Sequence, residues 1–152
     1  YVNGTRAYLA TELGGAGLMV LDVSSSTNIS LLGQEYFSVA HSVFASDLAE
    51  TLFGLAEDLY VVDTSSPSSI VTVGTGSPGD QMNDVTVRDD LAFLATSNSN
   101  QEFQVWDISS PASPTLLSSF NFSQIGTGID FEDNIVYVSV RSNDGLRIIT
   151  SQ

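Results

Sequence analysis

A small group of polar residues near position 80 has side chains suited to binding a cation. Asp80, Asn83 and Asp84 place two carboxylates and one amide within five residues. Oxygen atoms of this kind are the ligands that Ca²⁺ prefers, but the spacing lacks the Asp-x-Asp-x-Asp-Gly rhythm of an EF-hand loop. A solvated loop is therefore the default interpretation. Asp80 and Asp84 remain Ca²⁺ candidates, and no other cofactor is expected.

His41 is the only histidine, and its surroundings in the sequence offer little catalytic chemistry. Ser42 and Asp47 follow it, but adjacent residues of a strand point to opposite faces, which disfavours a Ser-His-Asp triad. Zinc needs several His or Cys ligands, and the chain has one His and no Cys. We expect His41 to be a packed, hydrogen-bonded polar residue, with a ligand contact as the alternative. No catalytic residue is assigned.

Residues 74–79 read Gly-Thr-Gly-Ser-Pro-Gly, which matches the dinucleotide fingerprint G-x-G-x-x-G. That motif binds pyrophosphate where a helix follows and directs its N-terminal amides at the ligand. Here Pro78 and another run of β-forming residues follow. The segment is therefore predicted to be a loop between strands.

Three aspartates recur at nearly equal spacing. Asp22, Asp63 and Asp107 lie 41 and 44 residues apart, each after an apolar run and before a serine-rich turn. A carboxylate in this position accepts backbone N–H groups and fixes the turn. Because one residue per repeat places the carboxylates far apart, turn capping is favoured over a shared metal ion.

The elements that carry these residues repeat with the same period. Aromatic residues in a second set of apolar runs, at Tyr8, Phe53, Phe93 and Tyr137, are 45, 40 and 44 residues apart. A period in the low forties made of short β-runs is typical of a β-propeller with one four-stranded blade per repeat. The predicted fold is all-β, a propeller or propeller fragment of about four blades, some incomplete, with three to four antiparallel strands each.

The expected blades span residues 1–37, 38–76, 77–122 and 123–152. Counting the runs gives three strands, two complete sets of four, and three strands, so the first blade is expected to lack its innermost strand and the last its outermost. We therefore expect the chain to belong to a longer polypeptide or to pack end to end with other copies, with a compact four-bladed ring as the rival.

Trp106 is expected in the core between blades, with a sugar-stacking platform as the alternative. The predicted buried residues are Tyr8, Leu21, Phe53, Val61, Phe93, Val105, Tyr137 and Ile148.

The repeated tract of apolar residues, Asp, one residue and Ser, at 20–24, 61–65 and 105–109, resembles the LVIVD-repeat family. The resemblance extends to upstream Ala-aromatic-Leu-Ala segments at 7–10 and 92–95 and covers essentially the whole chain. It implies β-propellers of secreted and cell-surface proteins, and the family supplies no shared catalytic residues. The fourth copy departs from the pattern, with Thr150 in place of the aspartate.

The amino-acid composition limits the kinds of partner that the chain is expected to bind. Eighteen acidic residues and four arginines give a net charge of −14, which disfavours nucleic-acid binding because phosphates are repelled. No apolar run approaches the ~20 residues that span a bilayer. Sequons at Asn3, Asn28 and Asn121 permit glycosylation.

The leading functional hypothesis is a non-enzymatic extracellular or cell-surface scaffold that binds a protein or glycan. Loops on a rigid ring usually carry the binding residues. The candidate ligand-facing residues are Glu12, His41, Asp80, Asn83, Asp84, Glu102 and Thr127. The alternatives are a cation-dependent hydrolase or lyase that uses carboxylates such as Asp80 and Asp84, and a self-assembling subunit of a surface layer or filament.

Overall fold

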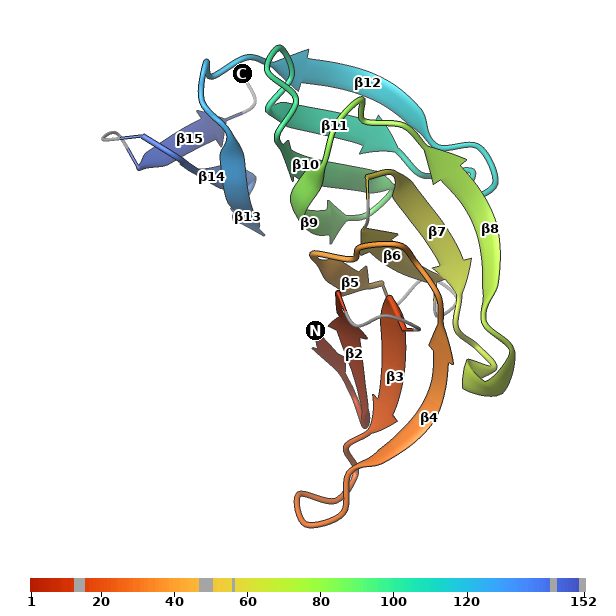
Figure 1. Ribbon diagram of the computed structural model, residues 1–152. Coiled ribbons are helices and arrows are strands. Elements are labelled where there is room, and N and C mark those ends of the chain that lie inside the picture. The colour runs from red at the N-terminus through yellow and green to blue at the C-terminus, as the bar shows by residue number, and fades with distance from the viewer. Residues whose placement is uncertain (13–15, 47–50, 56, 143–144, 151–152) are drawn as a thin grey trace.

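Four antiparallel sheets stand side by side along an open arc (Figure 1). The computed structural model describes residues 1–12, 16–46, 51–55, 57–142 and 145–150, with 51–55 as backbone only. The alternation of β-branched and aromatic residues with Gly, Asn, Asp and Pro turns explains why the chain forms short strands. The all-β propeller architecture is confirmed.

Each sheet is one blade, and its strands follow one another in sequence order. The first blade contains β1 (Val2–Asn3), β2 (Arg6–Ala10), β3 (Leu18–Asp22) and β4 (Ser30–Glu35). The second contains β5 (Val43–Ala45), β6 (Thr51–Leu55), β7 (Leu59–Asp63) and β8 (Val71–Gly76). The third contains β9 (Met82–Arg88), β10 (Leu91–Thr96), β11 (Phe103–Asp107) and β12 (Thr115–Phe120), and the fourth β13 (Gly126–Glu132), β14 (Ile135–Val140) and β15 (Leu146–Thr150). The outer strands β4, β8 and β12 lie on the convex side of the arc (Figure 1).

The first blade has an inner strand that the sequence prediction missed. β1 pairs with β2 through Val2 opposite Ala7 and Asn3 opposite Arg6. Gly4, with φ of 58°, occupies the tight turn between them. Two residues are too few to give a readable alternation of side chains, which is why this strand escaped notice. Among the described strands, only the fourth blade is short of one.

The hydrophobic core lies between blades rather than inside any one of them. Each blade has a back face, turned to the next blade in sequence, and a front face, turned to the preceding one. The back face of the first blade places Leu18 and Val20 against Val62 of the second. The same contact recurs with Val61 against Trp106, and between the third and fourth blades. A blade therefore buries its apolar side chains by docking on its neighbours.

The predicted core is confirmed in part. Tyr8, Val61 and Phe93 are buried, while Leu21, Val105 and Tyr137 are half-buried. The prediction for Ile148 is wrong, since this side chain is largely exposed on β15. It lies on the back face of the fourth blade, which no further blade covers among the described residues. The Phe53 side chain is outside the described residues.

The repeated aspartates cap the turns that follow the third strand of each of the first three blades. Each Oδ1 accepts the amide N–H two residues on, from Ser24, Ser65 and Ser109, at 2.8, 2.8 and 2.9 Å. Hydrogen bonds from the serine hydroxyl and then the amide hold the pKa of each aspartate below its usual 3.8. Turn capping, as predicted from the repeat, is their role.

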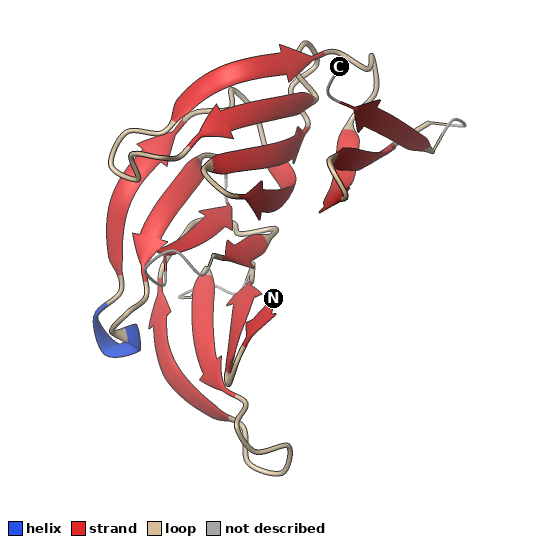
Figure 2. Ribbon diagram, turned by 180° about the vertical axis from the view of Figure 1, so that it is seen from behind, coloured by secondary structure: helices blue, strands red, loops and turns tan. Residues whose placement is uncertain are grey.

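Two glycines let the outer strands approach the neighbouring blade. A Cβ at Gly33 in β4 would overlap the Pro67 carbonyl oxygen, and one at Gly74 in β8 would overlap that of Pro111. Pro67 opens the short 3-10 helix η1 (Pro67–Ser69), which Figure 2 shows in blue. The two contacts lie in the same place on successive blades, so each glycine is required by the docking of the next repeat.

Candidate functional site

The loops that join β2 to β3, β4 to β5, β8 to β9, β10 to β11 and β12 to β13 share one side of the arc. Antiparallel strands reverse direction at each turn, so every second connection emerges on the same side. We call this side the loop face. It carries most of the residues that the sequence nominated for binding.

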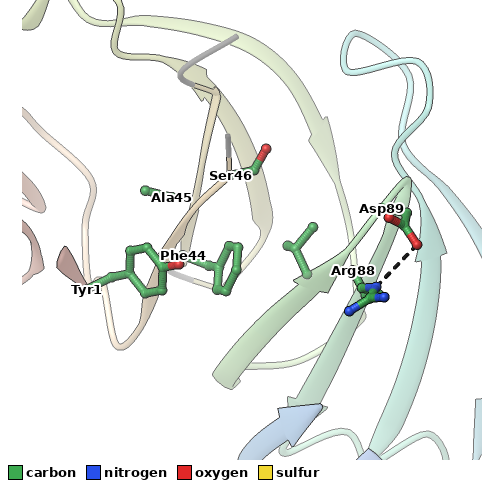
Figure 3. A pocket seen from close by; sticks show the side chains of 7 residues that line it. Tyr1, Phe44, Ala45, Ser46, Arg88 and Asp89 are labelled. Atoms are coloured by element: carbon green, nitrogen blue, oxygen red, sulfur yellow. Dashed lines mark hydrogen bonds and ion pairs between the residues drawn. The ribbon is translucent and has the colours of Figure 1, made fainter. Parts of the chain in front are cut away.

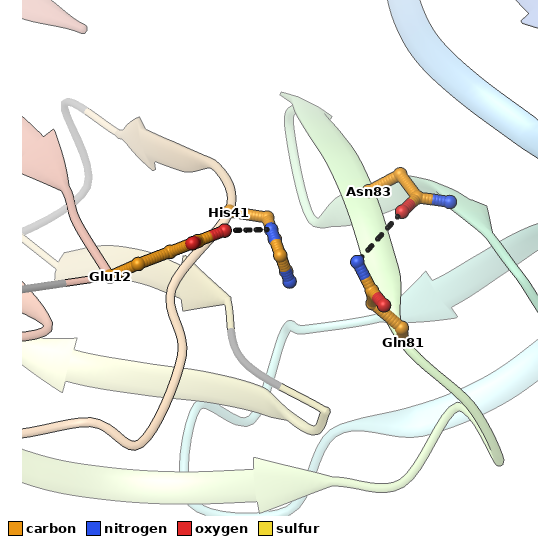
Figure 4. Close-up of polar contacts among 4 residues, drawn as sticks. All are labelled: Glu12, His41, Gln81 and Asn83. Atoms are coloured by element: carbon orange, nitrogen blue, oxygen red, sulfur yellow. Dashed lines mark hydrogen bonds and ion pairs between the residues drawn. The ribbon is translucent and has the colours of Figure 1, made fainter.

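His41 and Glu12 form an ion-pair contact across two blades. His41 precedes β5, Glu12 follows β2, and the Nδ1–Oε1 distance is 3.4 Å (Figure 4). The His41 side chain is 24% exposed and the Glu12 side chain 70% exposed. Both can therefore contact a ligand on the loop face.

Gln81 and Asn83 form a second polar pair at the start of the third blade. Gln81 donates from Nε2 to Asn83 Oδ1 at 3.3 Å (Figure 4). Asn83 donates from Nδ2 to Ser97 Oγ at 3.0 Å and to the Gly126 carbonyl at 2.7 Å. Asn83 thus joins the third blade to the fourth through its side-chain amide, whereas the Gln81 side chain contacts only Asn83 among these residues.

Asp84 ties three blades together. Its Oδ1 accepts the Ser42 hydroxyl of the second blade at 2.6 Å and its own neighbour's amide, from Val85, at 2.9 Å. Its Oδ2 accepts the Ile129 amide of the fourth blade at 2.9 Å. Both oxygen atoms are occupied by internal donors, which gives Asp84 a structural role.

Glu102 and Thr127 are also held by internal partners. Glu102 is 2% exposed, and its Oε2 accepts the Phe122 amide at 2.8 Å. Thr127 is exposed, and its hydroxyl lies 3.0 Å from Ser139 Oγ. Glu102 therefore fixes the loop that leads into β13, and Thr127 remains accessible beside it.

Asp80 is exposed, and its Oδ1 accepts the amide N–H of the next residue, Gln81, at 2.7 Å. It lines a polar hollow of about 400 Å³ with Glu57 and Asp58, and Asp58 accepts the Ser77 hydroxyl at 2.9 Å. Within the described ranges, no three His, Cys, Asp or Glu side chains are grouped as metal ligands. Asp80 and Asp84 belong to no such group, and Ca²⁺ binding by these two residues stays a prediction.

Sequence reasoning overlooked two amide side chains that set the shape of the loop face. Asn98 and Gln104 both donate to the Pro78 carbonyl, at 2.9 and 2.8 Å. Gln104 Oε1 in turn accepts the Trp106 indole N–H at 2.8 Å. The available signal in the sequence was a glutamine within an otherwise apolar strand, and the structure shows that this Gln104 is fully buried. Trp106 is buried in the core, as expected. The glycine-rich segment 74–79 is followed by strand β9 and not by a helix.

The opposite side of the arc has a smaller hollow near the inner strands (Figure 3). The Tyr1 and Phe44 rings lie with centroids 4.5 Å apart, and Arg88 Nε is 3.3 Å from Asp89 Oδ2. The hollow measures about 240 Å³. None of the candidate binding residues lines it, so it is separate from the loop face.

The three sequons lie in different surroundings. Asn28 and Asn121 are exposed, and Asn3 is half-buried in β1. Asn121 accepts the Ser123 amide at 2.6 Å. Among the described residues, no helix is long and apolar enough to cross a membrane.

Comparison with known proteins supports the repeat and the fold. The sequence model of the LVIVD repeat matches residues 1–35, 55–76 and 79–122. No curated protein is significantly similar in sequence.

Three solved structures resemble the chain at low sequence identity. The computationally designed Ika4 protein is 14% identical with a TM-score of 0.74, over 99% of this chain and 88% of that one. The designed Ika8 protein is 14% identical with a TM-score of 0.70, over 97% of this chain and 43% of that one. The Cps50 (Swd1) β-propeller domain of Myceliophteria thermophila is 10% identical with a TM-score of 0.73, over 96% and 52%. The chain thus spans about half the length of the last two, and the likeness establishes the propeller fold.

Proposed function

The chain belongs to the LVIVD-repeat family, and from that premise we propose that it is a non-enzymatic, extracellular or cell-surface scaffold that binds a protein or glycan through its loop face. The residues that would contact the ligand are Glu12, His41, Gln81 and Thr127. The extracellular location rests on the family resemblance. Rigid strands that present accessible polar side chains on one side are the usual arrangement of a recognition surface.

The proposal rests on the internal hydrogen bonds that Asp84 and Glu102 accept. Asp84 accepts hydrogen bonds from two neighbouring blades, and Glu102 is buried against a backbone amide. A general acid, a general base or a cation ligand needs an oxygen atom free to reach the substrate or ion. These contacts favour a structural role over the alternative of a cation-dependent hydrolase or lyase.

The loop face is also held in a fixed shape. The Pro78 carbonyl receives two side-chain amides, and Asn83 joins the third blade to the fourth. A surface fixed in this way loses little conformational entropy when it binds, which favours recognition of a rigid epitope. The exposed carboxylate of Glu12 favours a ligand that carries a positive charge or hydrogen-bond donors.

The test uses the labelled chain on a glycan microarray and on a panel of immobilised extracellular proteins. The double variant His41→Ala/Gln81→Ala should lose at least about tenfold in affinity for the probe that binds, equivalent to about 1.4 kcal/mol. Thr115→Ala, an exposed change at the other end of the third blade, is the matched control. The melting temperatures of both variants should match the parent. Equal affinity losses in variant and control, or no probe bound above background, would contradict the proposal.

A further inference from the structure

The arc ends in two apolar faces built from the same strand positions as the interfaces inside it. The front of the first blade presents Leu9, with Met19, Leu21 and Leu31 beside it, and the back of the fourth presents Leu146 and Ile148. Except for Leu31, whose equivalents Thr72 and Leu116 are exposed, strand register places each of these at a position that is buried elsewhere in the chain.

On the front face, Leu9 corresponds to Leu94 in the third blade and Val138 in the fourth. Each of the three lies in the second strand of its blade, opposite the third-strand residue that comes three positions before the repeated aspartate or its equivalent, Thr150. Leu94 and Val138 are 0% exposed, whereas Leu9 is 42% exposed. The difference arises because the first blade has no blade before it among the described residues.

On the back face, Ile148 corresponds to Val20 and Val61 in the first two blades. Val20 and Val61 are 0% exposed, and Ile148 is 61% exposed. Leu146, two residues earlier on the same face, matches Leu18 and is likewise uncovered. The two ends are therefore the unpaired halves of a contact that the chain already makes three times.

The size of the arc sets how many blades would complete it. Nearly the whole chain superposes on 52% of a β-propeller domain and on 43% of the Ika8 chain. Four blades thus occupy about half of such a fold, and the two ends are separated by an open gap (Figure 1). One further set of four blades, with the same front and back faces, supplies both missing contacts.

We infer that two copies of this chain close one ring, with the back of the fourth blade of each copy docked on the front of the first blade of the other. The two contacts are equivalent, so the assembly is a closed dimer rather than an open filament. Apolar burial at two blade interfaces drives association, while the charge of −14 on each copy opposes it. Dimerisation should therefore strengthen with salt, because the screening length falls from about 10 Å at 0.1 M to about 3 Å at 1 M.

The test is sedimentation velocity of the chain, residues 1–152, over a concentration series at low and high salt. The expected result is a species of twice the 16.1 kDa chain mass, more populated at high salt. Leu9→Asp and Ile148→Asp should each lower the association constant by more than about tenfold, because each places a charge in an apolar contact. Leu117→Asp is the matched control, since Leu117 is 55% exposed on β12, away from both end faces.

A mixture of the two variants separates this head-to-tail arrangement from a symmetric one. Leu9→Asp keeps an intact back face and Ile148→Asp an intact front face, so a mixed pair has one unchanged contact, and the mixture should contain more dimer than either variant alone. The inference is overturned if the parent chain stays monomeric at the highest concentration and salt. It is equally overturned by assemblies larger than two copies, by end-face variants that associate like the control, or by a mixture that contains no more dimer than either variant alone. Because no loop-face residue is changed, failure here leaves the proposed recognition function standing.

Discussion

The third and fourth blades come from the same repeat but differ in how they bury their strands. Both faces of the third blade are covered, with Leu94 packed toward the second blade and Phe103 toward the fourth. The fourth blade buries Val136 and Val138 on its front and exposes Leu146 and Ile148 on its back. The apolar pattern of the sequence therefore indicates which side chains can be buried, and the presence of a neighbouring blade decides which are.

The largest expected loss of stability comes from truncating one of two equivalent leucines, Leu94 between two blades and Leu9 on an uncovered face. Leu94→Ala should lower the free energy of unfolding by about 2–5 kcal/mol, because it leaves a cavity between two blades. Leu9→Ala should cost about 1 kcal/mol or less, since Leu9 is already partly in water. Urea unfolding at low protein concentration and low salt, where the chain is a single copy, measures both values. Equal losses would show that burial does not depend on the neighbouring blade.

A second contrast lies between two carboxylates four residues apart. Asp84→Ala should cost about 1.5–3 kcal/mol, because it leaves the Ser42 hydroxyl and the Ile129 amide without their acceptor. Asp80→Ala should change the free energy of unfolding by no more than about 0.5 kcal/mol. Thermal unfolding of both variants tests this, and a larger loss at Asp80 would refute the structural role of Asp84.

Substituting two glycines, one at a contact between blades and one in open space, tests how closely neighbouring blades approach. Gly74→Ala should cost about 1–3 kcal/mol, because the new Cβ would displace the Pro111 carbonyl of the next blade. Gly145→Ala, where no heavy atom of the described residues apart from the chain neighbours lies within 4 Å of the added Cβ, should stay within about 0.5 kcal/mol. Chemical denaturation gives both numbers, and a neutral Gly74→Ala would mean that the two blades dock less tightly than described.

The smallest effect concerns the capped turns and pH. The pKa values of Asp22, Asp63 and Asp107 are lowered in the folded chain, so their stabilisation is present above the usual value of 3.8 and is lost as pH falls through the folded values. Replacing all three with Asn should flatten the fall of melting temperature below pH 3.8 relative to the parent. Scanning calorimetry from about pH 5 to about pH 2.5 measures the slopes. Identical slopes would mean that the caps do not contribute.

The sequence predicted the parts of the fold that depend on local or periodic patterns. The period of the aspartates established the propeller, and their position before serine-rich turns predicted the caps that Asp63 and its equivalents form. The exposure of Ile148 was missed because the repeat pattern is the same whether or not a further blade follows. The ties made by Asp84 were missed because its partners lie 42 and 45 residues away. Such contacts become visible only once the blades are placed side by side.

Each blade is stabilised by the blades on either side of it. Hydrogen exchange, followed residue by residue in the Leu9→Asp variant to keep the chain monomeric, tests it most directly. Amides of β10 and β11, covered on both faces, should show the highest protection, and those of β14 and β15 should open at lower free energy. Uniform protection from β10 to β15 would contradict the account, since it would mean that the last blade is as stable as one with neighbours on both sides.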